Sequence, residues 1–437
     1  MPPARTDDDP EDPSPVVGPS KPRLLRVLGP GLITGASDDD PSGIATYAQA
    51  GAAFGYGLGW TLLYSYPLMV AVQMIAARIG RTTGHGIAGV LRRHAPHGLL
   101  QVTVLLLVVA NTVNLGADLG AMADAAILLR PGAPRWLLVL LFASVCVVLQ
   151  TWLAYARYVA VLKWLTLALF AYFAALATTQ VAWGAFALGT LVPRLGFDRE
   201  ELTTVVAVFG TTISPYLFFW QSSEEAEDLR VHPRRRDLIH APEQGRAALH
   251  RIELDTLVGM AVSNLVALAI LGTGASALHA RGVTEIRTSA EAAAALRPVA
   301  GPFAEAVFAL GVIGVGLLAV PVLAGSSAYA VGEARRWPVG YSRHVQEARA
   351  FYGVVALATL VGMLIGLTPG LDPVRALFWS AVLNGVVAVP VMAVMMRLAA
   401  DPAVMGRFAV AGWLKGLGWL ATGAMALAVA GMAVTAF

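Results

Sequence analysis

Residues 29–47 read GPGLITGASDDDPSGIATY, and they lie where the first apolar segment of this chain is expected to cross a membrane. Three adjacent carboxylates, Asp38, Asp39 and Asp40, directly precede Pro41, with glycines on both sides. Hydrocarbon tolerates charged, irregular backbone only where that backbone lines a cavity or is buried in protein. The interruption therefore predicts a binding site inside the first membrane span.

The composition of the whole chain is that of a polytopic membrane protein. Its 437 residues are 57% hydrophobic and only 14% charged, whereas a soluble globular protein carries about 25% charged residues. The isoelectric point of about 9.1 reflects arginines in loops, which favours membrane orientation over nucleic-acid binding. The spans contain no nucleophile–base pair, phosphate loop or metalloprotease motif, so we expect neither an enzyme nor a resident cofactor.

Apolar segments of about 20 residues predict an all-α membrane protein with eleven transmembrane helices. Residues 1–22, rich in aspartate and proline, are expected to form a disordered acidic tail, and residues 23–437 the transmembrane domain. The predicted spans are about 26–54, 57–79, 99–129, 135–153, 156–180, 202–226, 252–275, 303–331, 348–367, 373–397 and 407–434.

The distribution of arginine and lysine predicts the orientation of these spans. Basic residues are more numerous in the segments that are cytoplasmic if the N-terminus is cytoplasmic, among them Arg92, Arg93 and 234–236. We therefore expect a multi-pass protein of the inner cell membrane, embedded in lipid. A monomer is compatible with this architecture, and the sequence leaves the oligomeric state open.

A second interruption lies in the sixth predicted span, where residues 208–217 read VFGTTISPYL. Spans 1 and 6 enter the membrane from opposite sides. Matching breaks in two such halves are typical of an inverted repeat with a binding site near the midplane. The repeats would cover about 26–180 and 202–397, with an additional helix at about 407–434.

The chemistry of the two breaks predicts a small cation as ligand. The carbonyl end of a broken helix carries partial negative charge and favours cations. The donors near the breaks are almost all oxygen: the Asp40 carboxylate, backbone near Ser37 and Thr211, the Ser214 hydroxyl and the Tyr216 hydroxyl. Oxygen-only sites suit hard ions such as Mg2+, Ca2+ or Mn2+.

These residues carry a resemblance to a known family. The run GPG at 29–31, then DPSGIAT at 40–46 and QAGA at 49–52, resembles the first span of the NRAMP family of divalent-metal transporters, whose motif is Asp-Pro-Gly-Asn. The run GTTISPY at 210–216 occupies the place of the family's span-6 motif, Ala-x-x-Met-Pro-His. The resemblance implies a LeuT-like fold with an inverted 5+5 repeat, discontinuous helices 1 and 6, and secondary transport.

The departures from the family pattern bear on which ion is transported. Asp40 retains the family's metal carboxylate, and Thr211 falls where a backbone carbonyl is a ligand. Gly43 replaces the ligand asparagine, and Ser214 replaces the methionine whose sulfur favours Mn2+ and Fe2+. Tyr216 replaces a histidine associated with proton movement.

The third span has a comparable departure. Residues 114–121, NLGADLGA, resemble the family's proton-path segment and keep Asp118, but Ala121 stands where that segment has a glutamate. Asn111, Asn114 and Asp118 share one helix face, which either lines a water pathway or bonds a neighbouring helix.

Together these features resemble the divergent NRAMP-related magnesium transporters. We therefore expect transport of Mg2+, with Mn2+ as a further substrate, and weak or no proton coupling. Residues of the proton or ion pathway would be Asp118, Asp39 and Glu224; alternatively, the acidic run at 224–228 is a solvated helix end that pairs with arginines. Two other functions stay open: a proton-coupled Mn2+ or Fe2+ importer, which Asp118 and Asp124 would support, and an amino-acid or other organic-solute transporter on the same scaffold.

Overall fold

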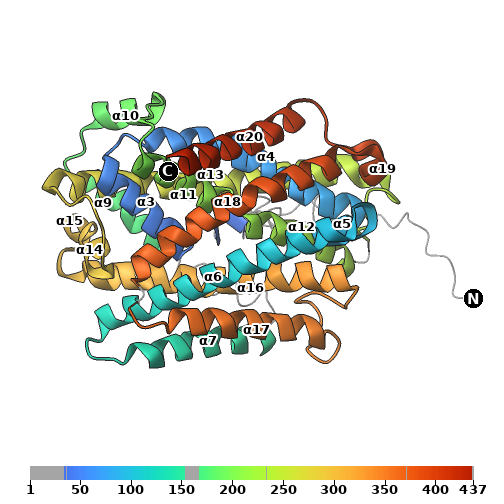
Figure 1. The fold of residues 1–437 in the computed structure, drawn as a ribbon, viewed down its shortest axis with the longest axis horizontal. Helices are drawn as coiled ribbons and strands as arrows, with labels where there is room; N and C mark the ends of the chain where they lie inside the picture. Colours follow the sequence, from blue (N-terminus) through green and yellow to red (C-terminus); the bar gives the residue numbers. More distant parts are fainter. Residues whose placement is uncertain (1–33, 36, 153–166, 233, 371, 436–437) are drawn as a thin grey trace, which may run out of the picture.

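The computed structural model describes residues 34–35, 37–152, 167–232, 234–370 and 372–435, and every regular element in these ranges is a helix (Figure 1). The long helices are α3 (Pro41–Phe54), α4 (Gly59–Thr83), α6 (His97–Leu129), α7 (Arg135–Trp152), α11 (Arg199–Thr212), α12 (Pro215–Val231), α13 (Gly245–Ala277), α16 (Ala304–Arg335), α17 (Arg349–Gly366), α18 (Pro373–Ala400) and α20 (Gly412–Val434). Shorter helices are α5 (Ile87–His94), α9 (Ala171–Thr178), α10 (Trp183–Leu191), α14 (Ser289–Ala294), α15 (Arg297–Ala300) and α19 (Pro402–Met405).

The observed helices follow the predicted spans closely. In the described residues, 8 helical segments are long and apolar enough to cross a membrane, and they correspond to predicted spans 2, 3 and 6 to 11. A shorter apolar helix, α7, corresponds to span 4. The start of span 1, residues 156–166 of span 5 and the tail at 1–22 lie outside the described residues, so the total of eleven stays a prediction.

Both predicted helix interruptions are present. The chain is helical at residues 34–35 and 37–38, leaves the helix at Asp39 and Asp40, and resumes in α3 at Pro41. In the second half α11 ends at Thr212, and α12 resumes at Pro215. Each second half-helix therefore begins on a proline after two non-helical residues.

The prolines explain where these breaks fall. A proline has no N–H to donate and is well suited to the first position of a helix, where that N–H would have no partner. Its ring also disfavours helical geometry in the preceding residue. Accordingly Asp40 and Ser214 are both extended, with ψ of 172° and 136°. Asp40 is the N-cap of α3, because its carboxylate accepts the Gly43 N–H.

Close helix packing surrounds the broken helices. α3 packs against α13, α18 and α11, while α6 packs against α16, α17 and α18. A Cβ added to Gly51 of α3 would lie 2.1 Å from the Leu271 carbonyl oxygen of α13, and one added to Gly210 of α11 would lie 2.0 Å from the Ala381 carbonyl oxygen of α18. Small residues at such crossings let backbones approach each other, which is how helices associate in lipid.

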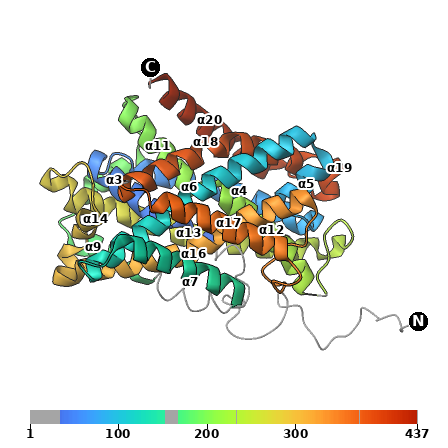
Figure 2. The ribbon, with the colours of Figure 1, turned by 60° about the horizontal axis from the view of Figure 1, so that its bottom comes forward.

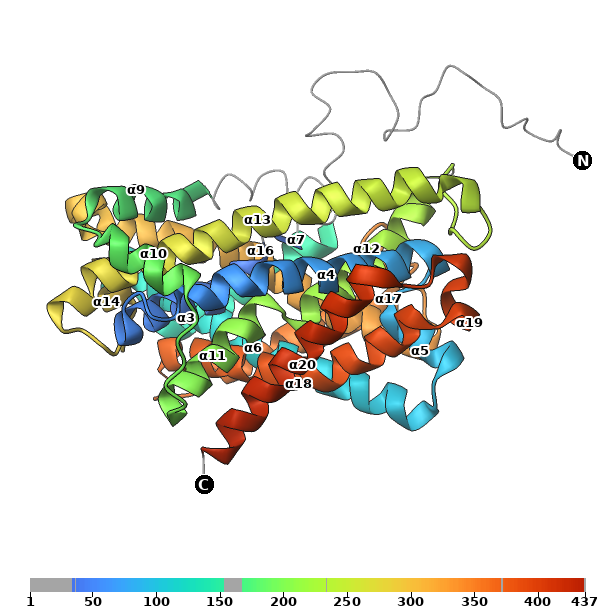
Figure 3. The same ribbon diagram turned by 90° about the horizontal axis from the view of Figure 1, so that it is seen from above.

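The molecule has two distinct ends along its longest axis. α9, α10 and α14 gather at one end and α5 and α19 at the other, as Figures 1 and 3 show; we call these the α14 end and the α5 end. His279, just after α13, lies 2.7 Å from the Ala52 carbonyl oxygen, so the last turn of α3 lies at the α14 end. The last turns of α20 extend away from the other helices (Figure 2).

The packing at Gly51 generates a testable expectation. Gly51→Ala places a methyl group against the α13 backbone, so we expect it to lower the free energy of unfolding by about 1–3 kcal/mol. Thermal unfolding in detergent measures the loss. The matched control is Gly423→Ala in α20, where nothing lies within 4 Å of an added Cβ and alanine's helix propensity favours the folded state by up to about 1 kcal/mol. Equal effects of the two substitutions would contradict the packing argument.

Candidate functional site

The carboxylate of Asp40 lies at the centre of the first break and is saturated with hydrogen bonds. Its Oδ1 accepts from the Ser42 hydroxyl at 2.6 Å and from the Gly43 N–H at 2.8 Å. Its Oδ2 accepts from the Asn114 amide at 2.9 Å and from the Tyr216 hydroxyl at 3.2 Å. Side chains from α3, α6 and α12 therefore converge on one fully buried carboxylate.

Tyr216 joins the two breaks directly. It stands in the first turn of α12, and its hydroxyl lies 3.0 Å from the Ser37 carbonyl oxygen as well as 3.2 Å from Asp40 Oδ2. Ser37 is the residue whose carbonyl was predicted to face the first break, so Tyr216 contacts two of the other five predicted ligands. The Tyr216 side chain is completely buried.

The other three predicted ligands lie in the first turn of α3 and at the second break. The Ser214 hydroxyl lies 2.6 Å from the Gly210 carbonyl oxygen and 2.9 Å from that of Thr211, so it caps the end of α11. A Cβ added to Gly43 would lie 3.1 Å from Thr211 Oγ1 and 3.2 Å from the Asp38 carbonyl oxygen. Glycine at position 43 thus lets the two breaks approach each other closely.

Three further carboxylates near the breaks are not saturated. Asp38 Oδ2 accepts from the Ser263 hydroxyl of α13 at 2.5 Å. Among the described residues, however, Asp38 Oδ1, Asp39 Oδ1 and both Asp118 oxygens are buried without a hydrogen-bond partner. A buried carboxylate oxygen in this condition requires a proton, a water molecule or a cation.

These carboxylates do not by themselves form a metal-binding cluster. In the part of the chain that the structure describes, no group of three or more His, Cys, Asp and Glu side chains is arranged to hold a metal ion. A cation at the breaks would therefore also need carbonyl and hydroxyl oxygens, as the sequence predicts.

The polar face of α6 mostly bonds neighbouring helices. Asn114 donates to Asp40 and accepts from the Ser380 hydroxyl of α18 at 2.6 Å. Asn111 donates to the Ser326 and Ser327 hydroxyls of α16 at 2.8 and 2.9 Å. Of the three polar residues on this face, Asp118 alone makes no such bond within the described chain.

Asp124 lies apart from that face. Its carboxylate forms an ion pair with Arg135 of α7 at 2.9 Å. This contact holds the end of α6 against the start of α7.

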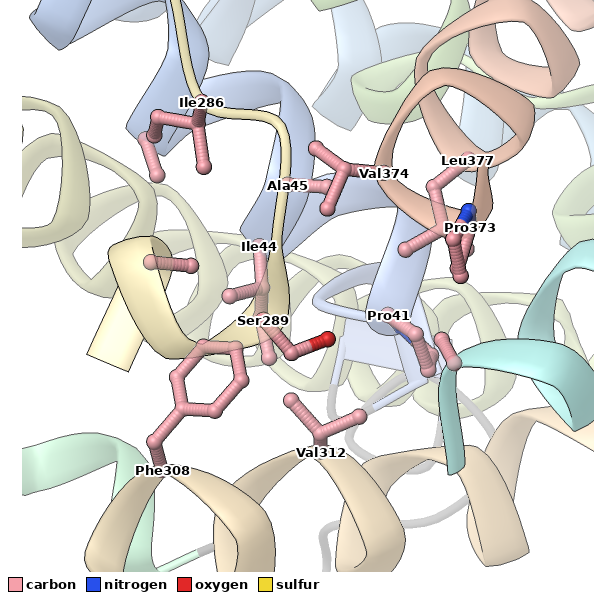
Figure 4. A pocket seen from close by; sticks show the side chains of 13 residues that line it. Pro41, Ile44, Ala45, Ile286, Ser289, Phe308, Val312, Pro373, Val374 and Leu377 are labelled. Carbon is pink, nitrogen blue, oxygen red and sulfur yellow. The ribbon is translucent and has the colours of Figure 1, made fainter. Parts of the chain in front are cut away.

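An apolar pocket of about 20 Å³ lies between the first break and the α14 end (Figure 4). Ser289 contributes the one polar side chain among its lining residues, which also include Ala121 of α6. The lining residues are Pro41, Ile44, Ala45, Ala48, Ala121, Ile286, Ser289, Ala292, Phe308, Val312, Pro373, Val374 and Leu377.

A segment at residues 283–292, which we call the strap, covers this pocket with Ile286 and Ser289. Gln49 of α3 holds it at two points: its side-chain amide donates to the Thr284 carbonyl at 3.0 Å, and its side-chain oxygen accepts the Ile286 N–H at 2.8 Å. Glu285 adds ion pairs to Arg375 and Arg287, each at 2.7 Å. Hydrogen bonds from these two arginines lower the pKa of the Glu285 carboxyl, but exposed pairs of this kind contribute little stability.

Glu224 lies toward the α5 end and contacts Tyr329 of α16. The Tyr329 hydroxyl lies 3.2 Å from Glu224 and also bonds Glu227, and Glu227 accepts the Ser342 N–H at 2.5 Å. Other acids of this run form ion pairs with arginines: Glu225 with Arg251, and Asp228 with Arg235. Glu225 and Asp228 thus pair with arginines, but the Glu225–Arg251 pair is buried rather than solvated, and Glu224 contacts a tyrosine instead.

Three residues that contact the candidate site residues were not predicted from the sequence. Ser263 bonds Asp38, Ser380 bonds Asn114, and Tyr329 bonds Glu224. Ser263 and Ser380 are lone small polar residues in apolar helices, a signal too common in membrane spans to identify a site. Tyr329 lies in the span-8 stretch SSAYA at 326–330, which carries no charge to mark it.

The fold and this site define a class: helical membrane proteins whose two discontinuous helices meet at a buried polar centre. The sequence model of the family described as "Nramp: natural resistance-associated macrophage protein-like" matches residues 31–435. The chain therefore belongs to the Nramp family, and the resemblance noted in its sequence is confirmed.

Two curated relatives cover most of the chain. A divalent metal cation transporter MntH of Klebsiella pneumoniae is 25% identical over 402 residues, which are 90% of this chain and 90% of the relative. A divalent metal cation transporter MntH of Burkholderia ambifaria is 28% identical over 394 residues, which are 89% of this chain and 83% of the relative. Both names describe transporters, in agreement with the expectation that the chain is not an enzyme.

Solved structures confirm the LeuT-like fold. The crystal structure of the Eremococcus coleocola manganese transporter with an aromatic bis-isothiourea substituted compound superposes with a TM-score of 0.74 at 18% identity, covering 94% of this chain and 87% of that one. MhsT in complex with L-phenylalanine superposes with a TM-score of 0.60 at 14% identity, covering 93% and 98%.

The two-point contact of Gln49 with the strap can be tested by hydrogen–deuterium exchange. We expect Gln49→Leu to speed amide exchange of the strap by several-fold to about tenfold, because each lost hydrogen bond is worth about 0.5–1.5 kcal/mol. Glu285→Gln removes the exposed ion pairs and is the control, with a smaller expected change. A larger effect of Glu285→Gln than of Gln49→Leu would show that the ion pairs hold the strap.

Proposed function

We propose that this protein is a secondary transporter of divalent metal cations that works by alternating access, with its ion site where the two broken helices meet. The observation that carries the proposal is the convergence of Asp40, the Ser37 carbonyl and the Tyr216 hydroxyl within hydrogen-bond distance. Family membership and the printed names of the two MntH relatives support the class of substrate.

The proposed substrate is Mg2+, with Mn2+ as a further substrate. The residues proposed to bind it, Asp40, Ser37, Gly43, Thr211 and Ser214, offer only oxygen among their side chains and carbonyls, and the Tyr216 hydroxyl lies beside Ser37 and Asp40. Oxygen ligands suit hard cations, whereas a thioether would favour softer ones. A site with one direct carboxylate also suits Mg2+, which keeps much of its hydration shell.

We further propose that proton coupling is weak or absent. Ala121, in the family's glutamate position, lines an apolar pocket and offers no group that could carry a proton. Asp124 is paired with Arg135. The alternative, a proton-coupled Mn2+ or Fe2+ importer, is supported by Asp118, whose two buried oxygens lack partners within the described chain.

An organic-solute transporter is the third candidate. The geometry gives it less support, because the space beside Gly43 is occupied by Thr211 and by the Tyr47 ring, which would lie 3.3 Å from a Cβ added at Gly43. The carboxylate of Asp40 at the same place opposes binding of a second carboxylate. The fold shared with MhsT does not bear on the substrate.

We propose that the α5 end faces the cytoplasm. Arg92 and Arg93 end α5, and Arg234 to Arg236 follow α12, as the excess of positive charge on the inner side requires. The ion pathway would then run along Asp39 and Asp118 near the breaks to Glu224 at the cytoplasmic side.

Uptake into proteoliposomes tests the proposed function. We expect Mg2+ and Mn2+ to enter without acidification of the lumen, and Asp40→Asn to reduce uptake at least about tenfold, because an ion pair with the cation is lost. Asp401→Asn is the matched control: Asp401 caps α19, and asparagine caps a helix equally well. Acidification that requires Mn2+ or Fe2+ would favour the proton-coupled importer, and no divalent flux would favour the organic solute.

The ligand chemistry predicts the effect of restoring a sulfur. We expect Ser214→Met to raise the ratio of Mn2+ to Mg2+ transport about tenfold, since a thioether binds the softer ion better. Competition between the two ions at fixed total concentration measures this ratio. Ser214→Ala, which removes the hydroxyl without adding sulfur, is the control, and an equal shift in both variants would contradict the proposed place of Ser214.

A further inference from the structure

The Tyr216 hydroxyl occupies the position that a cation bridging the proposed ligands would take. It lies 3.0 Å from the Ser37 carbonyl oxygen and 3.2 Å from Asp40 Oδ2. These are the two first-break oxygens proposed to bind the ion. The hydroxyl has a single proton with partial positive charge, which the two oxygens share, so Tyr216 presents to them the same sign of charge as a metal ion.

The hydrogen bonds of Asp40 leave no lone pair for an ion when the single Tyr216 proton points to it. An ionised carboxylate has about four acceptor positions, and Asp40 accepts from Ser42, Gly43, Asn114 and Tyr216. A metal ion cannot bind either oxygen while these donors point at it. At least one donor must therefore leave before Asp40 can coordinate a cation.

Tyr216 is the donor best placed to leave. Ser42 and the Gly43 N–H belong to the first turn of α3, next to the carboxylate itself. Asn114 is held from its other side by Ser380 of α18. The Tyr216 bond is the longest of the four, and it is the one that comes from α12, the helix that alternating access would move against α3.

We infer that Tyr216 is a tethered competitor for the transported cation. Its hydroxyl and the ion compete for the position between Ser37 and Asp40, so the hydroxyl withdraws with α12 when the ion binds. Its return displaces the ion and speeds release. The inference rests on the proposed function and assigns Tyr216 a role opposite to that of a ligand, because removal of its hydroxyl strengthens binding.

Isothermal titration of the full-length protein in detergent with MgCl2 and with MnCl2 tests this role. Tyr216→Phe keeps the buried ring and removes only the hydroxyl. We expect its Kd for the cation to fall about tenfold, the equivalent of one hydrogen bond to a charged group. Tyr172→Phe is the matched control, because Tyr172 is a buried tyrosine of α9 whose hydroxyl has no partner among the described residues, and its Kd is expected to equal that of the wild type.

Transport kinetics supply a readout that a merely structural role would not move. In proteoliposomes Tyr216→Phe is expected to lower both KM and the maximal rate, since the ion is held more tightly and released more slowly. A Kd that is unchanged or raised in Tyr216→Phe, while Asp40→Asn still abolishes binding, would overturn the inference and leave the proposed site in place. No binding of either ion by wild type and Tyr216→Phe alike would instead overturn the proposed metal site, and the inference with it.

Discussion

Broken helices inside a membrane must satisfy their own polar groups. Each interruption frees backbone donors and acceptors that neither water nor lipid can reach, and each group left unsatisfied in hydrocarbon costs several kcal/mol. The chain meets this constraint because the two breaks lie side by side and their polar groups bond to each other. Tyr216 at the start of α12 bonds the Ser37 carbonyl at the end of the first half-helix, and Asp40 caps α3 with its own side chain. The arrangement of the surrounding helices follows from this mutual satisfaction.

The site is consequently shared among more helices than the two broken ones. Asn114 brings α6 to Asp40, Ser380 brings α18 to Asn114, and Ser263 brings α13 to Asp38. Polar networks of this kind are favourable only when every member has its partner, because the low dielectric makes any missing bond expensive. Asp38, Asp39 and Asp118 have carboxylate oxygens without a hydrogen-bond partner among the described residues, and a transported ion or the water around it can bond to them.

Much of this architecture could be predicted from the sequence. The length of the apolar segments located the spans. The residue–proline pairs at 40–41 and 214–215 located the breaks, because the effect of proline on the backbone is local and can be predicted without the tertiary structure. The choice of Asp40 among the three adjacent carboxylates came from the resemblance to the family motif, and the structure places its side chain in contact with Asn114 and Tyr216. What could not be predicted were contacts over long separations, such as Ser380 with Asn114 and Ser263 with Asp38, which depend on helix rotation and register. The segments α10 and α14 were also missed, because they are too short to give an apolar signal.

The glycine contacts of the broken helices determine which parts can move as units. Gly51 lies directly against the α13 backbone, and Gly35, before the first break, would place a Cβ 2.3 Å from the Gly259 carbonyl oxygen of the same helix. Both halves of the first span thus rest on one continuous helix, while Gly210 and Gly385 join α11 to α18 in the same way. Backbones in direct contact cannot slide past each other unless the two helices first separate at these crossings. Span 1 with α13 and α11 with α18 are accordingly two tightly packed pairs, and the non-helical residues Asp39–Asp40 and Ile213–Ser214 interrupt the helical hydrogen bonding of each broken span at one point.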